Sequence, residues 1–203
     1  MIKNYVFDFG NVLARFYPDE LTAPYIADKE QRKIVSDVAF DRLYWNRLDE
    51  GTISDDEVKA GICSRLTEEQ GKLGCRAYDN WVLNLVPVEG MPQLVADLKA
   101  KGHKIYLVSN ISQKFASEYA QNPWIAQLFG LFDGLIFSSD YKVLKPTKEI
   151  FEILLNKFAL NPQECLFIDD LPANVKGAEA VGLNGYVFDG SAQNLRVALN
   201  DQL

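Results

Sequence analysis

The fold is decided by residues 5–12, which read YVFDFGNV. A short apolar run leads there into Asp8, and a glycine and an asparagine then turn the chain. A second run of the same form, CLFIDD, occupies residues 165–170. Short β-branched or aromatic runs bounded by turn residues are typical of buried parallel strands. Because ligands bind at the carboxyl ends of such strands, the sequence predicts a polar site containing Asp8, Asp169 and Asp170.

These three carboxylates indicate the kind of ligand that binds at the site. Neighbouring negative charges repel one another unless a cation lies between them. Carboxylate oxygens are the ligands that a hard cation such as Mg²⁺ prefers, and a bound cation attracts anionic substrates. The three carboxylates therefore predict a hard cation such as Mg²⁺ as the cofactor and an anionic substrate.

Length and composition exclude several other classes of protein. The chain has 203 residues, 48% of them hydrophobic, and a formal net charge of -7, which argues against a nucleic-acid binder. No window approaches the ~20 apolar residues of a membrane span, and the first residues lack the pattern of a signal peptide. Three cysteines without a CxxC pair favour reduced thiols. We expect a soluble cytoplasmic protein without a nucleic-acid or membrane partner.

From residue 89 onward, strand-like and helix-like patterns alternate. Strands are predicted at 103–108, 134–137, 165–169 and 185–188, with helices that include 92–100 and 149–159. Such alternation predicts a parallel sheet with helices on both faces. The expected fold class is α/β, with a three-layer, Rossmann-like core.

Residues 15–88 differ from the rest, because they contain no convincing strand and much helical patterning. Residues 54–57 (SDDE) form a capping box, and residues 67–70 (TEEQ) are a second candidate. We therefore expect two parts. Residues 1–14 and 89–203 form the catalytic core, and residues 15–88 form an inserted helical cap over the carboxyl ends of the strands.

Four places in the chain fit phosphoryl transfer, which are in order Asp8, Ser109, Lys145 and the pair Asp169–Asp170. Asp8 can attack phosphorus and form an aspartyl-phosphate. Asp169 and Asp170 can hold Mg²⁺, while the charge of Lys145 and the hydroxyl group of Ser109 can bind phosphate oxygens. Each residue alone also fits a structural role, such as a helix cap or a surface lysine. Their occurrence together favours the catalytic interpretation.

The same positions resemble the motifs of the haloacid dehalogenase (HAD) superfamily of hydrolases, along nearly the full chain. Residues 8–12 (DFGNV) resemble the first motif, 107–110 (LVSN) the second, 145–146 (KP) the third, and 168–170 (IDD) with Asn174 the fourth. The resemblance implies that Asp8 is the nucleophile and that Lys145 is catalytic with it. The implied metal ligands are Asp8, the main-chain carbonyl of Gly10, Asp169 and Asp170. The implied phosphate ligands are Ser109, Asn110 and Lys145.

The resemblance also implies a cap that closes over the substrate. The cap-pocket candidates are Arg15, Phe16, Tyr44 and Trp45. Aromatic residues in a small helical bundle form its core more often than they line a pocket. The single histidine, His103, starts a strand at the end away from the site and is not expected to be catalytic. Because caps in this superfamily often take part in dimer contacts, a homodimer is one expectation.

One position departs from the pattern of most phosphatases of the superfamily. Those enzymes carry a second aspartate two residues after the nucleophile, as general acid and base, and here that position is Gly10. The loss of such an acid can cost about 10²–10⁴-fold in rate for a poor leaving group. The D-x-G-N-V run is similar to a branch with sugar-phosphate phosphatases, including enzymes that act on glucose 1-phosphate. An anomeric leaving group departs more easily, so a small sugar phosphate is the expected substrate.

Two alternatives stay open from the sequence. A metal-independent 2-haloacid dehalogenase would use the same aspartate to attack carbon, and those enzymes also have a non-acidic residue at the position of Gly10. The acid pair Asp169–Asp170 argues against it, because dehalogenases need no metal. A degenerate member that binds a phosphorylated ligand without turnover is the second alternative, and the missing general acid motivates it.

Overall fold

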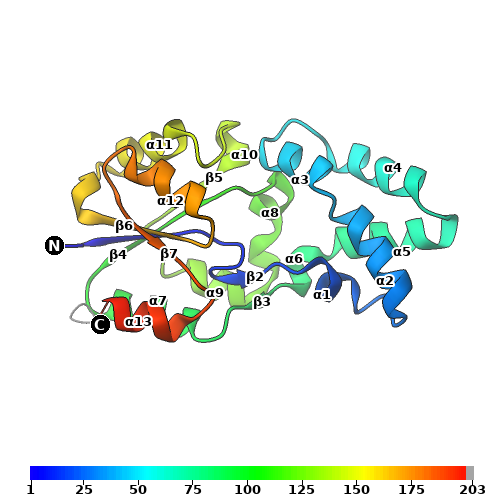
Figure 1. Ribbon diagram of the computed structural model, residues 1–203, viewed down its shortest axis with the longest axis horizontal. Coiled ribbons are helices and arrows are strands. Elements are labelled where there is room, and N and C mark those ends of the chain that lie inside the picture. The colour runs from blue at the N-terminus through cyan, green and yellow to red at the C-terminus, as the bar shows by residue number, and fades with distance from the viewer. Residues whose placement is uncertain (200–203) are drawn as a thin grey trace.

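The computed structural model describes residues 1–199. A five-stranded parallel sheet forms one part of the molecule, and helices pack around it (Figure 1). The strand order is β5-β4-β1-β6-β7. The strands are β1 (Asn4–Phe7), β4 (Lys104–Ser109), β5 (Gly134–Phe137), β6 (Cys165–Asp169) and β7 (Asn184–Val187). Phe7 pairs with Leu107 on one side and Ile168 on the other. The carboxyl ends of the three central strands therefore lie side by side.

Side chains of β1 alternate between two apolar layers, because successive strand residues point to opposite faces of a sheet. Tyr5 and Phe7 join the larger apolar cluster, and Val6 joins the smaller one on the other face. All three side chains are fully buried. A strand buried on both faces needs a continuous apolar run, which is the pattern seen in the sequence.

Helices cover both faces of the sheet (Figure 1). On one face lie α11 (Lys148–Phe158) and α12 (Pro172–Glu179), and on the other lie α7 (Met91–Ala100), α9 (Pro123–Phe129) and α13 (Ala192–Leu199). Phe151 of α11 packs with Phe167 of β6 at 5.1 Å between ring centroids. The predicted three-layer α/β core is thus confirmed.

The segment of residues 16–85 is mostly helical and lies beyond the carboxyl ends of the strands (Figure 1). Its helices are α1 (Pro18–Thr22), α2 (Lys29–Ala39), α3 (Arg42–Asp49), α4 (Asp55–Arg65), α5 (Glu68–Asp79) and α6 (Trp81–Asn84). Both capping boxes are present, at the starts of α4 and α5. The division into a core and a separate cap domain at residues 15 and 88 stays a prediction.

The structure corrects some details of the predicted elements. The short strands β2 (Ala14–Arg15) and β3 (Val86–Pro87) pair antiparallel at the two ends of the helical segment, where no strand was expected. Two residues are too few to produce a periodic pattern. The polar residues after β5 form a short helix, α10 (Ser138–Tyr141). The remaining elements are α8 (Gln113–Glu118), η1 (Tyr119–Gln121) and η2 (Pro162–Glu164).

Across residues 1–199, none of the helices combines the length and the apolar character that crossing a membrane requires.

Candidate active site

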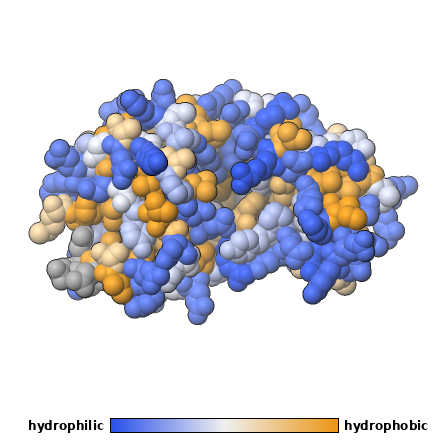
Figure 2. Space-filling model, in the orientation of Figure 1, coloured by the Kyte–Doolittle hydropathy of each residue, from blue (hydrophilic) through white to orange (hydrophobic). Residues whose placement is uncertain are grey.

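A cavity of about 400 Å³ lies where β1, β4 and β6 end, and Figure 2 shows the surface hollowed between the sheet and the helical segment. The charged and polar residues from the sheet side are Asp8, Ser109, Asn110, Lys145 and Asp170, with Asn11 and Asn174. The helix α3 contributes Arg42, Trp45, Asn46 and Asp49 to the opposite wall. The cavity therefore has one wall from the strand ends and one from the helical segment.

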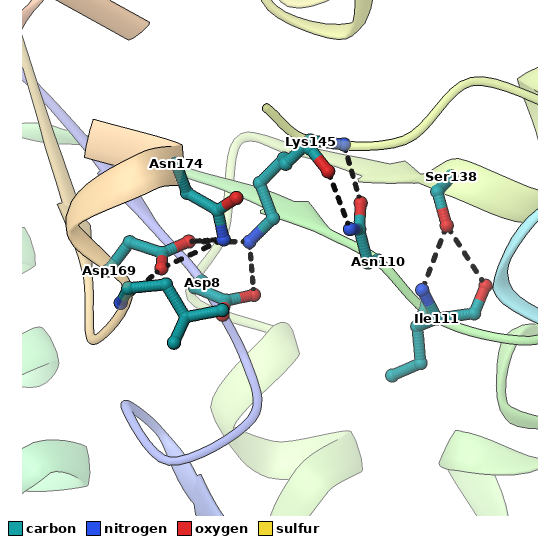
Figure 3. A network of polar contacts seen from close by, with 8 residues as sticks. Asp8, Asn110, Ile111, Ser138, Lys145, Asp169 and Asn174 are labelled. Atoms are coloured by element: carbon teal, nitrogen blue, oxygen red, sulfur yellow. Dashed lines mark hydrogen bonds and ion pairs between the residues drawn. The ribbon is translucent and has the colours of Figure 1, made fainter. Parts of the chain in front are cut away.

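Lys145 is the central cation of the strand-end wall (Figure 3). Its side chain is buried, and its Nζ lies 2.6 Å from Asp8 Oδ1 and 2.7 Å from Asp169 Oδ2. Burial alone would lower the pKa of Lys145, but the negative charges of Asp8 and Asp169 outweigh that effect and raise it. Lys145 is thus held as an ammonium group between two carboxylates.

Asp169 is fully buried and accepts hydrogen bonds from three different residues of this network. In addition to the bond from Lys145, it accepts hydrogen bonds from Leu171 N at 2.8 Å and from Asn174 Nδ2 at 3.0 and 3.1 Å. Buried carboxylates need such donors, because an unpaired charge in the interior is costly. The bonds from Asn174 give it a structural role next to the acidic pair.

Asn110 fixes the main chain of Lys145 from the end of β4. Its Nδ2 donates to Lys145 O at 3.0 Å, and its Oδ1 accepts from Lys145 N at 2.7 Å (Figure 3). Two bonds from one side chain define both the position and the orientation of the segment. The amide group of Asn110 therefore positions Lys145, and its predicted contact with phosphate stays a prediction.

The carboxyl groups of the site carry more negative charge than Lys145 can neutralise. Desolvation raises the pKa of Asp8 to about 7, the charge of Asp169 adds to this rise, and Lys145 opposes it. Burial and the charge of Asp169 also raise the pKa of Asp170. Burial is the first cause of both shifts, because it disfavours the charged form of a carboxyl group.

The same three acids fit a divalent cation. One oxygen from each of Asp8, Asp169 and Asp170 lies within 4.8 Å of the others. Oxygen ligands and excess negative charge are what Mg²⁺ requires. Gly10, two residues after Asp8, also lines the cavity, so its main-chain carbonyl is a further candidate ligand. The donor set therefore suits the predicted cofactor.

The structure brings most of the sequence candidates together, but not all of them. Ser109 is buried at the end of β4 and lines the cavity. Phe16 and Trp45, from the helical segment, also line the cavity. Arg15 and Tyr44 are not among the lining residues in the described part of the chain. Arg15 pairs with Glu20, and the hydroxyl group of Tyr44 lies next to Gly61 and Arg65. A position at the start of the helical segment, or within it, does not by itself direct a side chain into the cavity.

Asp49 was not a sequence candidate, although it lines the cavity. The signal that could have found it is the spacing along α3. Arg42, Trp45, Asn46 and Asp49 fall at i, i+3, i+4 and i+7, which places them on one face of a helix. Once Arg42 or Trp45 is placed at the cavity, the same face leads to Asp49.

Comparison with known proteins identifies the family. The model of the haloacid dehalogenase-like hydrolase family matches residues 2–182. D-ribitol-5-phosphate phosphatase from Bacteroides thetaiotaomicron is 28% identical over 98% of this chain and 100% of that protein. Sesquiterpene phosphatase astK from Aspergillus oryzae is 26% identical over 90% of this chain and 88% of that protein. The chain belongs to the haloacid dehalogenase-like hydrolase family, as its four motifs predicted.

A solved structure supports the fold. It is a crystal structure of an HAD family enzyme from Bacteroides thetaiotaomicron, an aspartate-to-alanine mutant in complex with magnesium and inorganic phosphate. It superposes with a TM-score of 0.73 at 22% identity and covers 96% of this chain and 99% of its own. The sheet and the helical segment therefore occur together in a known HAD enzyme.

Proposed function

We propose that this protein is a Mg²⁺-dependent phosphomonoester hydrolase that forms an aspartyl-phosphate on Asp8. The observation that carries the proposal is the convergence of Asp8, Asp169 and Asp170 around the ammonium group of Lys145 at one edge of the sheet. Two relatives that match nearly the whole chain are named as phosphatases, which supports the same activity.

Asp8, Lys145 and Ser109 act together in the first step. A carboxylate oxygen of Asp8 attacks phosphorus while the bond to the ester oxygen breaks. Lys145 offsets the negative charge on the phosphoryl oxygens, and Ser109 holds these oxygens by a hydrogen bond. Water then attacks phosphorus, which releases inorganic phosphate and restores the carboxylate of Asp8.

Asp8, Asp169, Asp170 and the carbonyl oxygen of Gly10 would hold Mg²⁺. When bound, the ion offsets the repulsion between the carboxylates and the phosphate and stabilises charge on the transferred group. Lys145 supplies one positive charge against the three clustered carboxyl groups, which leaves an excess of negative charge when all three are ionised. A phosphate dianion would therefore bind poorly without the ion.

The substrate is a small sugar phosphate. A cavity of about 400 Å³ suits a molecule of that size, and its walls combine aromatic rings with hydrogen-bonding groups. Phe16 and Trp45 offer flat apolar faces, while Arg42 and Asn46 offer donors for hydroxyl groups. The relative named D-ribitol-5-phosphate phosphatase supports a polyol chain of similar size.

Hydrolysis of para-nitrophenyl phosphate with Mg²⁺, and with EDTA in its place, tests the activity. We expect turnover that needs the metal and that Asp8→Asn abolishes. Asp37→Asn is the matched control, because Asp37 is exposed and its ion pair is with Lys33 on the same helix. Turnover that survives chelation or the loss of Asp8 would refute the mechanism.

The same preparation decides between the alternatives. Chloride release from 2-chloropropionate without Mg²⁺ would indicate a dehalogenase. Binding of phosphate with no turnover of any ester would indicate a degenerate, binding-only protein. Glucose 1-phosphate against glucose 6-phosphate tests the preference for an anomeric leaving group, and equal values of kcat/KM would contradict that preference.

The proposal also covers the cellular location and the oligomeric state of the protein. The acidic net charge and the free thiols of Cys63, Cys75 and Cys165 support a cytoplasmic protein without a nucleic-acid partner. A homodimer is proposed from the family resemblance alone. Light scattering coupled to gel filtration measures its mass in solution.

A further inference from the structure

The helix α3 faces the strand-end acids across the cavity. Arg42, Trp45, Asn46 and Asp49 form one stripe along this helix, and all four line the cavity. Asp49 is the last residue of α3, and it is the only carboxylic acid on that wall among the lining residues. A substrate phosphate bound beside Asp8 would therefore have its leaving group directed toward α3.

The end of α3 is fixed on the core of the protein. The hydroxyl group of Ser138, at the start of α10, donates to the main-chain carbonyl of Asp49 at 2.6 Å. Two residues later, Gly51 has a φ of +65°, and a Cβ there would lie 3.0 Å from the carbonyl oxygen of Ser139. Only a glycine accepts both the conformation and the close approach. These contacts set the position of Asp49 relative to the sheet.

The titratable groups of the lining leave one candidate for a proton donor. They are Asp8, Arg42, Asp49, Lys145 and Asp170. Arginine does not release its proton in proteins. The ammonium group of Lys145 is held by two carboxylates, and Asp8 and Asp170 belong to the proposed nucleophile and metal site. Asp49 remains, with a carboxyl group that no hydrogen bond or ion pair engages within residues 1–199.

The surroundings of Asp49 favour its protonated form. Desolvation raises its pKa to about 7, the charges of Asp8 and Glu50 add to the rise, and Lys145 opposes it. A general acid is most effective when its pKa lies near the working pH. Asp49 can therefore hold a proton near neutral pH and release it during a reaction.

We propose that Asp49 is the general acid that protonates the leaving oxygen of the substrate. As Asp8 forms its bond to phosphorus, the ester P–O bond breaks, and the carboxyl proton of Asp49 passes to the departing oxygen. The resulting carboxylate then takes a proton from the water that attacks the aspartyl-phosphate, so that Asp49 returns to its acid form. This inference rests on the proposed phosphatase function. It supplies the acid that Gly10 cannot provide.

The test compares two esters that differ in how well their leaving groups depart. Para-nitrophenolate is a stable anion and departs without a proton donor. The more basic oxygen of phenyl phosphate departs more readily when a general acid protonates it as the P–O bond breaks. We expect Asp49→Asn to lower the ratio of kcat/KM for phenyl phosphate to that for para-nitrophenyl phosphate by about 10²-fold. The term kcat/KM covers the steps through departure of the leaving group, so the later attack of water does not affect the ratio. Asp49→Glu should restore part of it.

Asp37→Asn is the matched control, because it makes the same change at an exposed aspartate that does not line the cavity. It should leave the ratio unchanged. The anchor from Ser138 uses the main chain of Asp49, so Asp49→Asn retains it. An unchanged ratio in Asp49→Asn, whether both rates stay or fall together, would overturn the role of Asp49. A wild-type protein inactive on both esters would refute the phosphatase function itself, and this inference with it.

Discussion

Lys145 holds a buried ammonium group against two carboxylates, Asp8 and Asp169, at 2.6 and 2.7 Å. Removing charged groups from water is costly, and their mutual attraction offsets that cost only when the geometry is good. Asn110 supplies this geometry by holding the main chain of Lys145 through two hydrogen bonds. The lysine therefore stabilises the acidic site and prepares it for an anion.

We predict that Lys145→Met lowers both activity and stability. The buried carboxylates would lose their cation, which costs about 3–5 kcal/mol when one partner of a buried pair is removed. kcat/KM should fall by at least about 10²-fold, because a fixed positive charge at the phosphate is lost. Urea unfolding and steady-state kinetics measure the two effects. Lys33→Met, at an exposed lysine, is the control, and a Lys145→Met variant as active as wild type would contradict the assignment.

Asp133 lies away from the site, and its carboxyl group has a lowered pKa that contributes to the stability of the fold. Burial alone would raise its pKa, but hydrogen bonds from Lys99, Ile105 N and Lys104 lower the pKa of Asp133 to about 2. A carboxyl group with a lowered pKa stabilises the fold above its unfolded pKa of ~4, and this contribution is lost as the pH falls toward 2.

Asp133→Asn should therefore cost about 2 kcal/mol of unfolding free energy at pH 7. The difference from wild type should shrink below pH ~4, where the unfolded carboxyl group takes up a proton. Urea unfolding at a series of pH values measures it. Asp37→Asn should show little difference at any pH, because its ion pair with Lys33 is exposed. A difference that is independent of pH would contradict the electrostatic origin.

At the residue scale, the sequence indicated the acids because they end or follow apolar strands, and it indicated Lys145 because this residue belongs to a recognisable motif. The contacts that position them could not be predicted. Asn110 bonds to main-chain atoms of Lys145, 35 residues away, and no side-chain pattern records such a bond. Asp49 was missed for a similar reason, since its place depends on how α3 meets the core.

At the scale of elements, the junction between α3 and α10 joins the helical segment to the sheet. Ser138 accepts a hydrogen bond from Ile111 N at 2.8 Å and donates one to Asp49 O at 2.6 Å. Its neighbour Ser139 is also buried, but its hydroxyl group has no hydrogen-bond partner within the described residues. Two adjacent serines in the same helix therefore differ in their expected contribution to stability.

Ser138→Ala should cost about 1–3 kcal/mol of unfolding free energy, because it leaves a buried N–H and a carbonyl without partners. Ser139→Ala should be neutral or slightly stabilising, because it removes a buried hydroxyl group that has no partner. Urea unfolding of the two variants side by side measures the difference. Equal losses of stability would show that the junction does not depend on the hydrogen bonds of Ser138.

The length and the apolar pattern of an element decide whether the sequence could predict it. The strands β1 and β6 are short apolar runs that end in acid, and α11 has apolar residues at helical spacing, so their patterns were sufficient. The pair of β2 and β3 depends on two segments that the helical region brings together. Such pairing is a tertiary effect, which a single sequence does not show.

At the scale of the whole molecule, the site lies between the sheet and the helical segment, and these two parts share one apolar core. A single large apolar cluster includes Phe7 of the sheet, Leu48 of α3 and Trp81 of α6. A ligand that binds in the cavity should therefore stabilise the whole fold and not only the segments that carry Asp8, Asp169 and Asp170. A ligand that binds the native state alone raises the stability by mass action.

Mg²⁺ together with inorganic phosphate, each at about 100 times its Kd, should raise Tm by about 5–10 °C. The shift should disappear with EDTA and in Asp170→Asn, which removes one of the three clustered acids. Differential scanning calorimetry measures it, with Asp37→Asn as a variant that should keep the shift. An equal shift with EDTA present would contradict a metal-dependent site.

The most direct test of the central claim is to trap the phosphoenzyme. The protein is mixed with para-nitrophenyl phosphate and Mg²⁺, quenched in acid and treated with borohydride, which reduces an aspartyl-phosphate to homoserine. Peptide mapping by mass spectrometry should find homoserine at position 8, dependent on substrate and Mg²⁺, and should find none in Asp8→Asn. Release of phosphate with Asp8 unmodified, or with the label on another acid, would contradict catalysis through Asp8.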